Sequence, residues 1–368
     1  MTADLASGRE LLDDLAELVG SESPSADVAA LARCADVVDT LGRRRIGATA
    51  ERIHVGDRVH LRWQLGRPRV VLLGHFDTVW PVGTLARWPF EVDGDRVTGP
   101  GTFDMKAGLV QLFAALQSLT DLDGVAVLTT SDEEIGSTTS QQLIEDTCRD
   151  ARAVLVLEPS ADGAVKIARK GVGMFTLEIT GRAAHAGLEP ENGINATIEA
   201  AHQVLAAAAL GRPASGTTVT PTVVTAGTTA NTVPAAARVA VDVRAASAAE
   251  MQRVESALQS LTPQLPGAGV KLVTHSVRLP LESEMSADLF GRAQRHASDL
   301  GLPALAGVAV GGGSDGNLTA ALGVPTLDGL GAVGGNAHAE GEWVSVASMP
   351  QRTALVAALV RDLLEETR

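Results

Sequence analysis

Five short segments of the chain each carry a side chain that can bind a hard or borderline metal ion. Most of them follow an apolar run typical of a buried strand, and in open α/β sheets sites form beyond the carboxyl ends of the strands. Histidines and carboxylates without thiolates suit zinc, with manganese or cobalt as alternatives. The pattern predicts a two-metal hydrolytic centre with a bridging carboxylate. The segments are His75-Phe76-Asp77, Asp104-Met105-Lys106, Glu133-Glu134, Glu158-Pro159-Ser160 and His338.

Taken one at a time, these residues also have plainer interpretations. A histidine after a strand is often structural, but Asp77 lies two residues after His75, where a carboxylate can accept the second ring N–H of a metal-bound histidine. Asp104 precedes a predicted helix, so it is either a helix N-cap or a carboxylate that bridges two ions. Glu158 ends an apolar strand and is either a surface group or a metal ligand. The residues alone leave these alternatives open.

The pair Glu133-Glu134 is harder to explain as structure. Two adjacent carboxylates at the end of a strand repel each other unless cations or solvent lie close by. If one of them binds a metal, its neighbour can point the other way and act as a general base. The pair therefore favours the catalytic interpretation.

The elements that must position these residues follow an alternating order. The apolar segments 69–74, 125–130 and 153–157 predict buried strands. Helical spacing of apolar residues marks the segments between and around them, at 9–19, 27–41, 105–119 and 137–149. Apolar strands that alternate with helices indicate an α/β fold with a mostly parallel sheet covered on both faces.

The alternation of apolar strands and helices changes near Gly171. Strands at 174–180, 218–225, 237–243 and 270–277, with helices at about 194–210 and 247–261, give the β-α-β-β-α-β order of a ferredoxin-like α+β sandwich. After Pro280 the earlier rhythm returns, with a helix at 286–299, a strand at 324–327 and a helix at 348–366. We therefore expect one domain formed by 1–170 and 281–368, interrupted by an inserted domain at 171–280.

Composition excludes several classes of protein. At 368 residues the chain exceeds one typical core, and its net charge of −14 argues against a nucleic-acid partner. The two cysteines, Cys34 and Cys148, form neither a disulfide framework nor a paired-cysteine metal site. We see no secretory signal and no membrane span, so we expect a cytoplasmic protein without a membrane partner. The absence of tyrosine excludes a catalytic tyrosine.

Three motifs carry a resemblance to a known family. His75-Phe76-Asp77-Thr78-Val79, the segment Gly101–Gly108 and Ser131-Asp132-Glu133-Glu134-Ile135-Gly136-Ser137 resemble the co-catalytic dizinc metallopeptidase family. That family includes carboxypeptidase G, aminoacylases, acetylornithine deacetylase and succinyl-diaminopimelate desuccinylase, and the resemblance extends over almost the whole chain. It implies a zinc-peptidase catalytic domain with an inserted dimerisation and lid domain, and hence a homodimer.

The resemblance also implies a role for each residue. His75 and Glu158 would hold one Zn²⁺, Glu134 and His338 a second, and Asp104 would bridge the two ions of each chain. Glu133 would be the general base, and Asp77 would orient His75. In the inserted domain, His185 resembles a family histidine that reaches the partner subunit's active site and stabilises an oxyanion, although it is also readable as an exposed loop residue.

Further segments resemble family substrate-binding elements. Asn231 and Arg244 would hold a substrate carboxylate, with Arg278 as a further candidate, although either arginine is also readable as a surface residue. The loop from Gly311 to Asn317 resembles the Gly-Gly-Gly-Thr-Asp segment of carboxypeptidase G-like members, and its amides could receive a carboxylate. The candidates there are Gly312, Gly313 and Ser314. A dinucleotide loop would need a strand–helix context that is missing.

The sequence thus predicts a dizinc amidohydrolase that cleaves a peptide or amide bond beside a free carboxylate. Its substrate would be a small peptide or an N-acyl amino acid. A carboxypeptidase G-like glutamate carboxypeptidase is the first choice, and an N-acyl-amino-acid deacylase is the alternative, because side-chain selectivity depends on pocket shape. A non-catalytic binding protein with this fold would be expected to have lost a ligand or Glu133, and the sequence retains them all.

Overall fold

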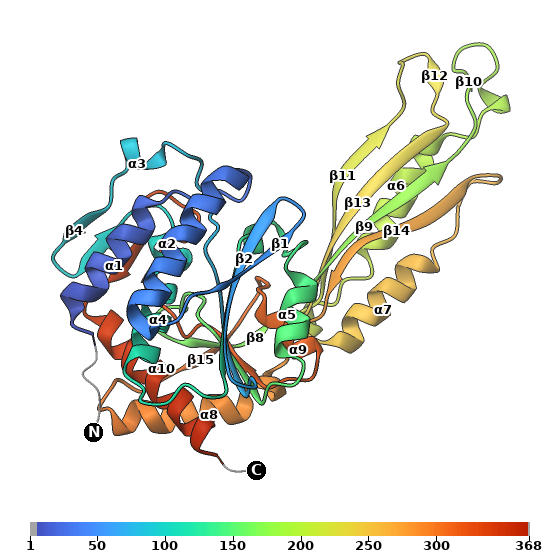
Figure 1. Ribbon diagram of the computed structural model, residues 1–368. Helices are drawn as coiled ribbons and strands as arrows, with labels where there is room; N and C mark the ends of the chain where they lie inside the picture. Colours follow the sequence, from blue (N-terminus) through green and yellow to red (C-terminus); the bar gives the residue numbers. More distant parts are fainter. Residues whose placement is uncertain (1–5, 367–368) are drawn as a thin grey trace. The chain divides into compact units, whose positions relative to one another are not determined.

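The computed structural model describes residues 6–366, and these separate into two compact units (Figure 1). The first unit is formed by Met1–Ala168, Ser283–Val310 and Ser314–Arg368, and the second by Arg169–Glu282 with Gly311–Gly313. The unit bounds at 168/169 and 282/283 lie two residues from the expected domain bounds, whereas Gly311–Gly313, expected in the first domain, belong to the second unit. The roles of the units as catalytic domain and lid stay predictions.

The main sheet of the first unit contains the strands that end in the candidate ligands. Its spatial order is β1-β2-β6-β3-β7-β16. Strands β6, β3, β7 and β16 run parallel, and β1 and β2 add an antiparallel hairpin at one edge, which the sequence analysis missed. The bounds are β1 (Glu51–Val55), β2 (Arg58–Leu65), β3 (Val70–His75), β6 (Val125–Thr130), β7 (Ala153–Val156) and β16 (Thr326–Leu327).

Helices cover both faces of this sheet. Val70 and Leu72 of β3 pack into a core with α1, α2, α4, α8 and α10, whereas Val71 and Leu73 pack against α5 and α9 on the other face. Because successive residues of a strand point to opposite faces, a strand covered on both sides must be apolar throughout. The bounds are α1 (Gly8–Gly20), α2 (Val28–Ile46), α4 (Ala107–Gln117), α5 (Gln141–Cys148), α8 (Ser283–Asp299), α9 (Gly316–Ala321) and α10 (Ser348–Glu365).

A smaller antiparallel sheet of the first unit has the order β17-β18-β5-β4. The loop 336–342 connects β17 to β18, and β5 leads into the loop that carries Asp104, so this sheet brings His338 towards Asp104. Gly334 is required there, because a Cβ atom at this position would collide with the carbonyl oxygen of Trp343. The remaining bounds of this unit are α3 (Thr84–Arg87), β4 (Glu91–Asp93), β5 (Arg96–Thr98), β8 (Val165–Arg169), β15 (Gly307–Val310), β17 (Gly334–Gly335) and β18 (Trp343–Ser345).

The second unit is an antiparallel sheet of order β11-β13-β9-β14 with α6 and α7 on one face. With the strands taken in chain order, this is the arrangement of a β-α-β-β-α-β sandwich. Phe175 and Leu177 of β9 face the helices, whereas Met174 points to solvent. The bounds are β9 (Gly171–Thr180), β10 (Ala184–His185), α6 (Ala196–Ala208), β11 (Thr218–Ala226), β12 (Thr232–Val233), β13 (Ala236–Ala245), α7 (Ala248–Gln259) and β14 (Gly269–Arg278).

No helix within residues 6–366 combines the length and the apolar character that a membrane crossing requires.

Candidate metal centre

The candidate ligands come from the carboxyl ends of neighbouring parallel strands. His75 is the last residue of β3, Glu133 and Glu134 follow β6, and Glu158 follows β7. Strand β3 lies between the other two in the sheet. Because the strands are parallel, these residues meet at one edge, as the sequence analysis expected.

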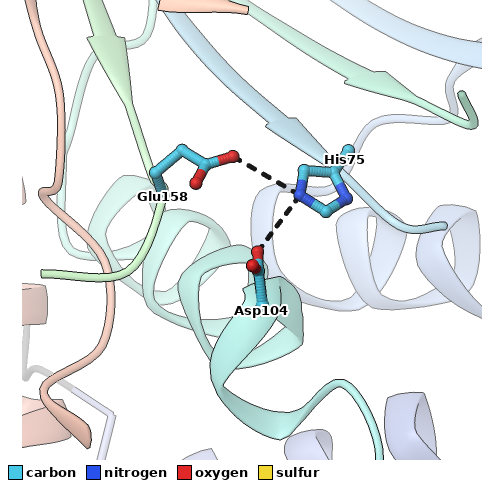
Figure 2. Close-up of side chains that lie close together, drawn as sticks. All are labelled: His75, Asp104 and Glu158. Carbon is cyan, nitrogen blue, oxygen red and sulfur yellow. Dashed lines mark ion pairs between the residues drawn. The ribbon is translucent and has the colours of Figure 1, made fainter. Parts of the chain in front are cut away.

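The first group of ligands consists of His75, Asp104 and Glu158 (Figure 2). The Nε2 atom of His75 lies 3.4 Å from Asp104 Oδ1 and 3.4 Å from Glu158 Oε1. His75 is buried, and both its Nε2 and Asp104 Oδ1 lack a hydrogen-bond partner among the described residues. Burial disfavours the charged ring, but the nearby carboxylates of Asp104, Asp77 and Glu158 outweigh it and raise the pKa of His75 well above its usual value. Buried polar atoms with no partner are costly, and a cation between them would satisfy both.

The second group consists of Asp104, Glu134 and His338. The Nε2 atom of His338 lies 3.3 Å from Asp104 Oδ2 and 3.0 Å from Glu134 Oε2. Hydrogen bonds to Asp104 and Glu134 raise the pKa of His338 to about 10. Asp104 thus presents one oxygen to each group, and within each group the ligand atoms lie within 4.8 Å of one another. This arrangement fits two metal ions with Asp104 as the shared ligand.

Asp104 does not cap a helix. Helix α4 begins at Ala107, and its N-cap position is Lys106, whose side chain makes no capping hydrogen bond. Asp104 lies in the preceding turn, Thr102–Lys106, with non-helical backbone angles. The bridging alternative is therefore the one that the local geometry favours. The expected helix at 105–119 is correspondingly shorter.

The turn that carries Asp104 is held by Glu342, a residue that the sequence analysis gave no role. Glu342 Oε1 accepts the backbone N–H groups of Phe103 at 2.7 Å and Asp104 at 2.8 Å, and Oε2 accepts those of Gly101 at 3.1 Å and the Trp80 indole at 2.9 Å. Glu342 is fully buried, and burial raises its pKa to about 7. Because Glu342 lies four residues after His338, it fastens the loop of one ligand to the loop of another.

Lys106 anchors the other end of this turn. Its ammonium group is buried and donates to the carbonyl oxygens of Leu18 at 3.0 Å and Ser21 at 2.8 Å, at the end of α1. Burial lowers the pKa of Lys106. A lysine that points away from the ligands, into backbone carbonyls, serves to fix the position of the turn.

Asp77 acts on more than His75. The Nδ1 atom of His75 lies 3.0 Å from the main-chain oxygen of Asp77 and 3.5 Å from its carboxylate. The Asp77 carboxylate accepts the backbone N–H groups of Glu133 and Glu134, each at 3.2 Å, and the hydroxyl of Ser25 at 2.7 Å. The expected orientation of His75 thus comes chiefly from a carbonyl group, and the carboxylate positions the two glutamates.

Glu133 and Glu134 have different surroundings, and their roles as general base and metal ligand stay predictions. The Glu134 carboxylate joins the second group of ligands, whereas Glu133 belongs to neither group. Burial, and then repulsion from Glu158, raises the pKa of Glu133 well above its usual value. A half-buried carboxylate with a raised pKa beside two ligand groups has the properties of a general base.

The segment after Glu134 has a buried support. The carboxylate of Asp315, just after the Gly-rich loop, accepts hydrogen bonds from the hydroxyl groups of Ser137 and, at 3.3 Å, Thr130. Ser314, a predicted substrate ligand, is buried; its hydroxyl donates to Asp328 at 2.6 Å and its N–H to Asn317 at 3.0 Å. In this structure Ser314 and Asp315 fix the architecture of the first unit.

The other predicted substrate residues belong to the second unit. His185 is exposed on β10, and its Nδ1 accepts the N–H of Gly187 at 3.1 Å. The Arg244 guanidinium is engaged in a two-point ion pair with Asp242, at 2.9 and 3.0 Å. Asn231 is exposed in the connection before β12. The remaining residues of this set are Arg278 on β14 and Gly312 and Gly313 in the Gly-rich loop. Their contact with a substrate stays a prediction.

Comparisons with known proteins agree with this geometry. The family model described as "Peptidase family M20/M25/M40" matches residues 71–362. Carboxypeptidase G2 of Pseudomonas sp. (strain RS-16) is 30% identical over 370 residues, which cover 96% of this chain and 89% of that protein. Acetylornithine deacetylase of Myxococcus xanthus is 30% identical over 54% of this chain and 56% of its own length.

The fold agrees as well. The crystal structure of the M20 family metallo-carboxypeptidase Sso-CP2 from Sulfolobus solfataricus superimposes with a TM-score of 0.73 at 17% identity, and the match covers 96% of this chain and 98% of that one. The mixed α/β architecture with a large, mostly parallel sheet is therefore shared with a solved member. By its sequence match and its metal-ligating geometry, the chain belongs to peptidase family M20/M25/M40 and is a metal-dependent hydrolase.

Proposed function

We propose that the protein is a dizinc amidohydrolase that cleaves a peptide or amide bond beside a free carboxylate, as a carboxypeptidase G-like glutamate carboxypeptidase. The observation that carries the proposal is Asp104, whose two oxygens face two separate groups of ligands. The similarity to carboxypeptidase G2 over nearly the full chain supports the choice of substrate class.

The donor atoms fit two zinc ions. His75 and Glu158 would hold one, Glu134 and His338 the other, and Asp104 both; manganese or cobalt would suit the same donors. When bound, the ions supply an acidified water and polarise the carbonyl group that is attacked. The unpartnered Nε2 of His75 and Oδ1 of Asp104 are the atoms whose burial such an ion would satisfy.

The chain's own residues then move the proton. Glu133 takes it from water and returns it to the leaving nitrogen, a role in which a raised pKa helps. Asp77 holds the backbone of Glu133 and Glu134, so the base and the ligand keep a fixed separation. Asp315 holds the end of the same segment through Ser137.

The second unit would supply the contacts to the substrate carboxylate. We assign this role to Asn231, Arg244 and Arg278, with the loop residues Gly312, Gly313 and Ser314, and oxyanion stabilisation to His185 of a second copy of the chain. Arg244 would then exchange its contact with Asp242 for the substrate. The homodimer would form through the second unit, where β11 and β14 are edge strands open to pairing.

A deacylase of N-acyl amino acids is the second candidate, and the similarity to acetylornithine deacetylase favours it. Both reactions use the same centre and differ in which side of the amide bond carries the selected group.

The test is hydrolysis by the zinc-loaded protein of C-terminal dipeptides, folate-like acyl-glutamates and N-acetyl amino acids, read by mass spectrometry. We expect release of C-terminal glutamate, and Glu133→Gln to lower the rate by roughly 10²–10⁴-fold without loss of metal. Glu145→Gln, a change on α5, is the matched control. Two bound metals with cleavage of the N-acetyl amino acids only would select the deacylase. Absence of both metal and hydrolysis would overturn the proposal.

A further inference from the structure

A cavity of about 330 Å³ lies in the first unit, and none of the metal-centre residues lines it. Its walls come from the turn at Asp162, from α8 and the segment that follows it, and from α10. The walls are largely aliphatic, with Leu302, Leu305 and Leu355 among them. The volume lies at the lower end of the range of small-molecule sites, which are typically about 300–1,000 Å³.

One charged side chain, Arg352, lines this cavity and is itself buried, at 5% exposure. Its Nη2 atom donates to the carbonyl oxygen of Gly163 at 2.5 Å. No carboxylate in residues 6–366 forms an ion pair with it; Asp162, the acid that shares the cavity, is exposed and makes none. The Nε and Nη1 atoms of Arg352 make no hydrogen bond within the described chain and are not fully buried. Arg352 lines the cavity, so these donors are available to a ligand there.

The buried guanidinium group of Arg352 carries a positive charge without an anionic partner among the described residues. Burial lowers the pKa of Arg352 to about 10, so the group still carries its charge at neutral pH. Removing a cation from water without an anionic partner costs free energy, and one carbonyl group returns only part of it. A carboxylate would match the planar fork of N–H groups, and an aliphatic body would match the leucine-lined walls.

We propose that this cavity is a binding site for a small carboxylate with an aliphatic body, whose carboxylate pairs with Arg352 and whose body packs against Leu302, Leu305 and Leu355. The site is separate from the hydrolytic centre, and its existence does not depend on the proposed function. Either a free aliphatic amino acid or a short carboxylic acid carries this chemistry.

The test measures binding of 4-methylpentanoate to the zinc-loaded full chain by isothermal titration calorimetry. The uncharged isostere 4-methylpentanamide is the matched ligand control. We expect the carboxylate to bind at least tenfold more tightly than the amide, and Arg352→Met to remove that difference. Leucine has the same skeleton with an added ammonium group, so its affinity relative to 4-methylpentanoate distinguishes an amino acid from a simple acid as the ligand.

Two further variants keep the result decisive. Ala306→Phe fills the cavity without touching Arg352, so it should abolish binding even if Arg352→Met does not fold. Asp104→Asn alters the metal centre and should leave binding at the cavity intact. The proposal fails if the wild-type protein binds the amide equally well or binds neither ligand, if binding survives both cavity variants, or if only Asp104→Asn removes it.

Discussion

The carboxylates of the second unit and those at the strand edge of the first unit have different partners. In the second unit Glu250 is paired with Arg253 at 2.8 Å, Asp242 with Arg244 at 2.9 Å, and Glu178 with Arg238. At the strand edge of the first unit, Asp104 and Glu134 instead face histidines. An arginine satisfies an acid permanently, whereas a histidine with a neutral form leaves room for a metal ion.

The pKa values of these carboxyl groups distinguish the candidate metal centre from ordinary ion pairs. Burial, and the acids beside them, raise the pKa of both Glu133 and Glu134, whereas hydrogen bonds to Arg253 lower the pKa of Glu250 to about 2. A raised pKa means that the surroundings disfavour the charged carboxylate, and a bound cation would reverse that preference. The first unit also contains ordinary ion pairs, such as Arg45 with Asp14, so the contrast belongs to the strand edge and not to the whole unit.

The largest effect should come from replacing the carboxylate that the two ligand groups share. Asp104→Asn removes a negative charge from both ligand groups, so we expect the bound metal to fall from two ions to one or none. Hydrolysis should fall by roughly 10³-fold or more, since several kcal/mol of transition-state stabilisation are lost. Metal content by mass spectrometry and initial rates measure both effects. Glu178→Gln, which breaks an arginine-paired acid in the second unit, is the control; equal losses in the two variants would contradict the comparison.

A smaller effect is expected from Glu342→Gln. The amide keeps one acceptor oxygen but turns an NH₂ group towards two of the four N–H donors, which loosens the turn that holds Asp104. We expect metal affinity to fall by about 10–100-fold, with activity recovering as zinc is raised.

The control for Glu342→Gln is Glu340→Gln, which removes an exposed partner of Arg87 in the same loop. Competition with a chelator gives both affinities. A loss of stability with unchanged metal affinity would show that Glu342 supports only the fold.

Ser25→Ala should have a still smaller effect on catalysis. It removes one hydrogen bond to the Asp77 carboxylate, worth about 1 kcal/mol, and hence about a fivefold reduction in kcat. Ser23→Ala is the matched variant, because Ser23 donates instead to the carbonyl oxygen of Phe76 at 2.6 Å. Similar kcat values for the two variants would show that the contact between Ser25 and Asp77 does not help to position Glu133.

Glu250→Gln should leave hydrolysis unchanged and alter only the pH dependence of stability. The folded protein holds the pKa of Glu250 at about 2, below its usual value of 4.5, because Arg253 hydrogen-bonds to the charged form. The unfolded chain therefore binds the proton more tightly, so this contribution is present above pH 4.5 and is lost as the pH falls towards 2. Thermal unfolding from pH 7 to pH 3 should show a shallower decline in the variant; parallel curves would contradict the assignment.

The parts of the site that the sequence predicted are those with a local signal. His75, Glu133 and Glu158 each follow an apolar strand, and parallel strands place such residues together whatever the details of packing. The hairpin β1–β2 was missed because its exposed first strand, Glu51–Val55, lacks a continuous apolar run.

Glu342 and Asp315 could not be found in this way. Each acts on groups that are distant in the sequence: Glu342 on the backbone at 101–104 and Asp315 on Ser137. When a carboxylate accepts hydrogen bonds from backbone N–H groups, the sequence does not reveal the donors, because every residue except proline has such a group. The supports of the site therefore become visible only when the chain is folded.

The contact between Trp80 and Glu342 makes the protein its own optical probe. The sequence contains four tryptophans and no tyrosine, so its near-ultraviolet emission comes from indole rings alone. Trp63 is buried in the core, with its ring centroid 5.0 Å from that of Phe113. The Trp80 indole instead donates to the Glu342 carboxylate that holds the Asp104 turn. It also packs edge-on against Trp88, with the ring centroids 5.1 Å apart. Any ion that tightens or releases that turn changes the surroundings of Trp80, so filling of the metal centre can be followed in real time by fluorescence, without a label.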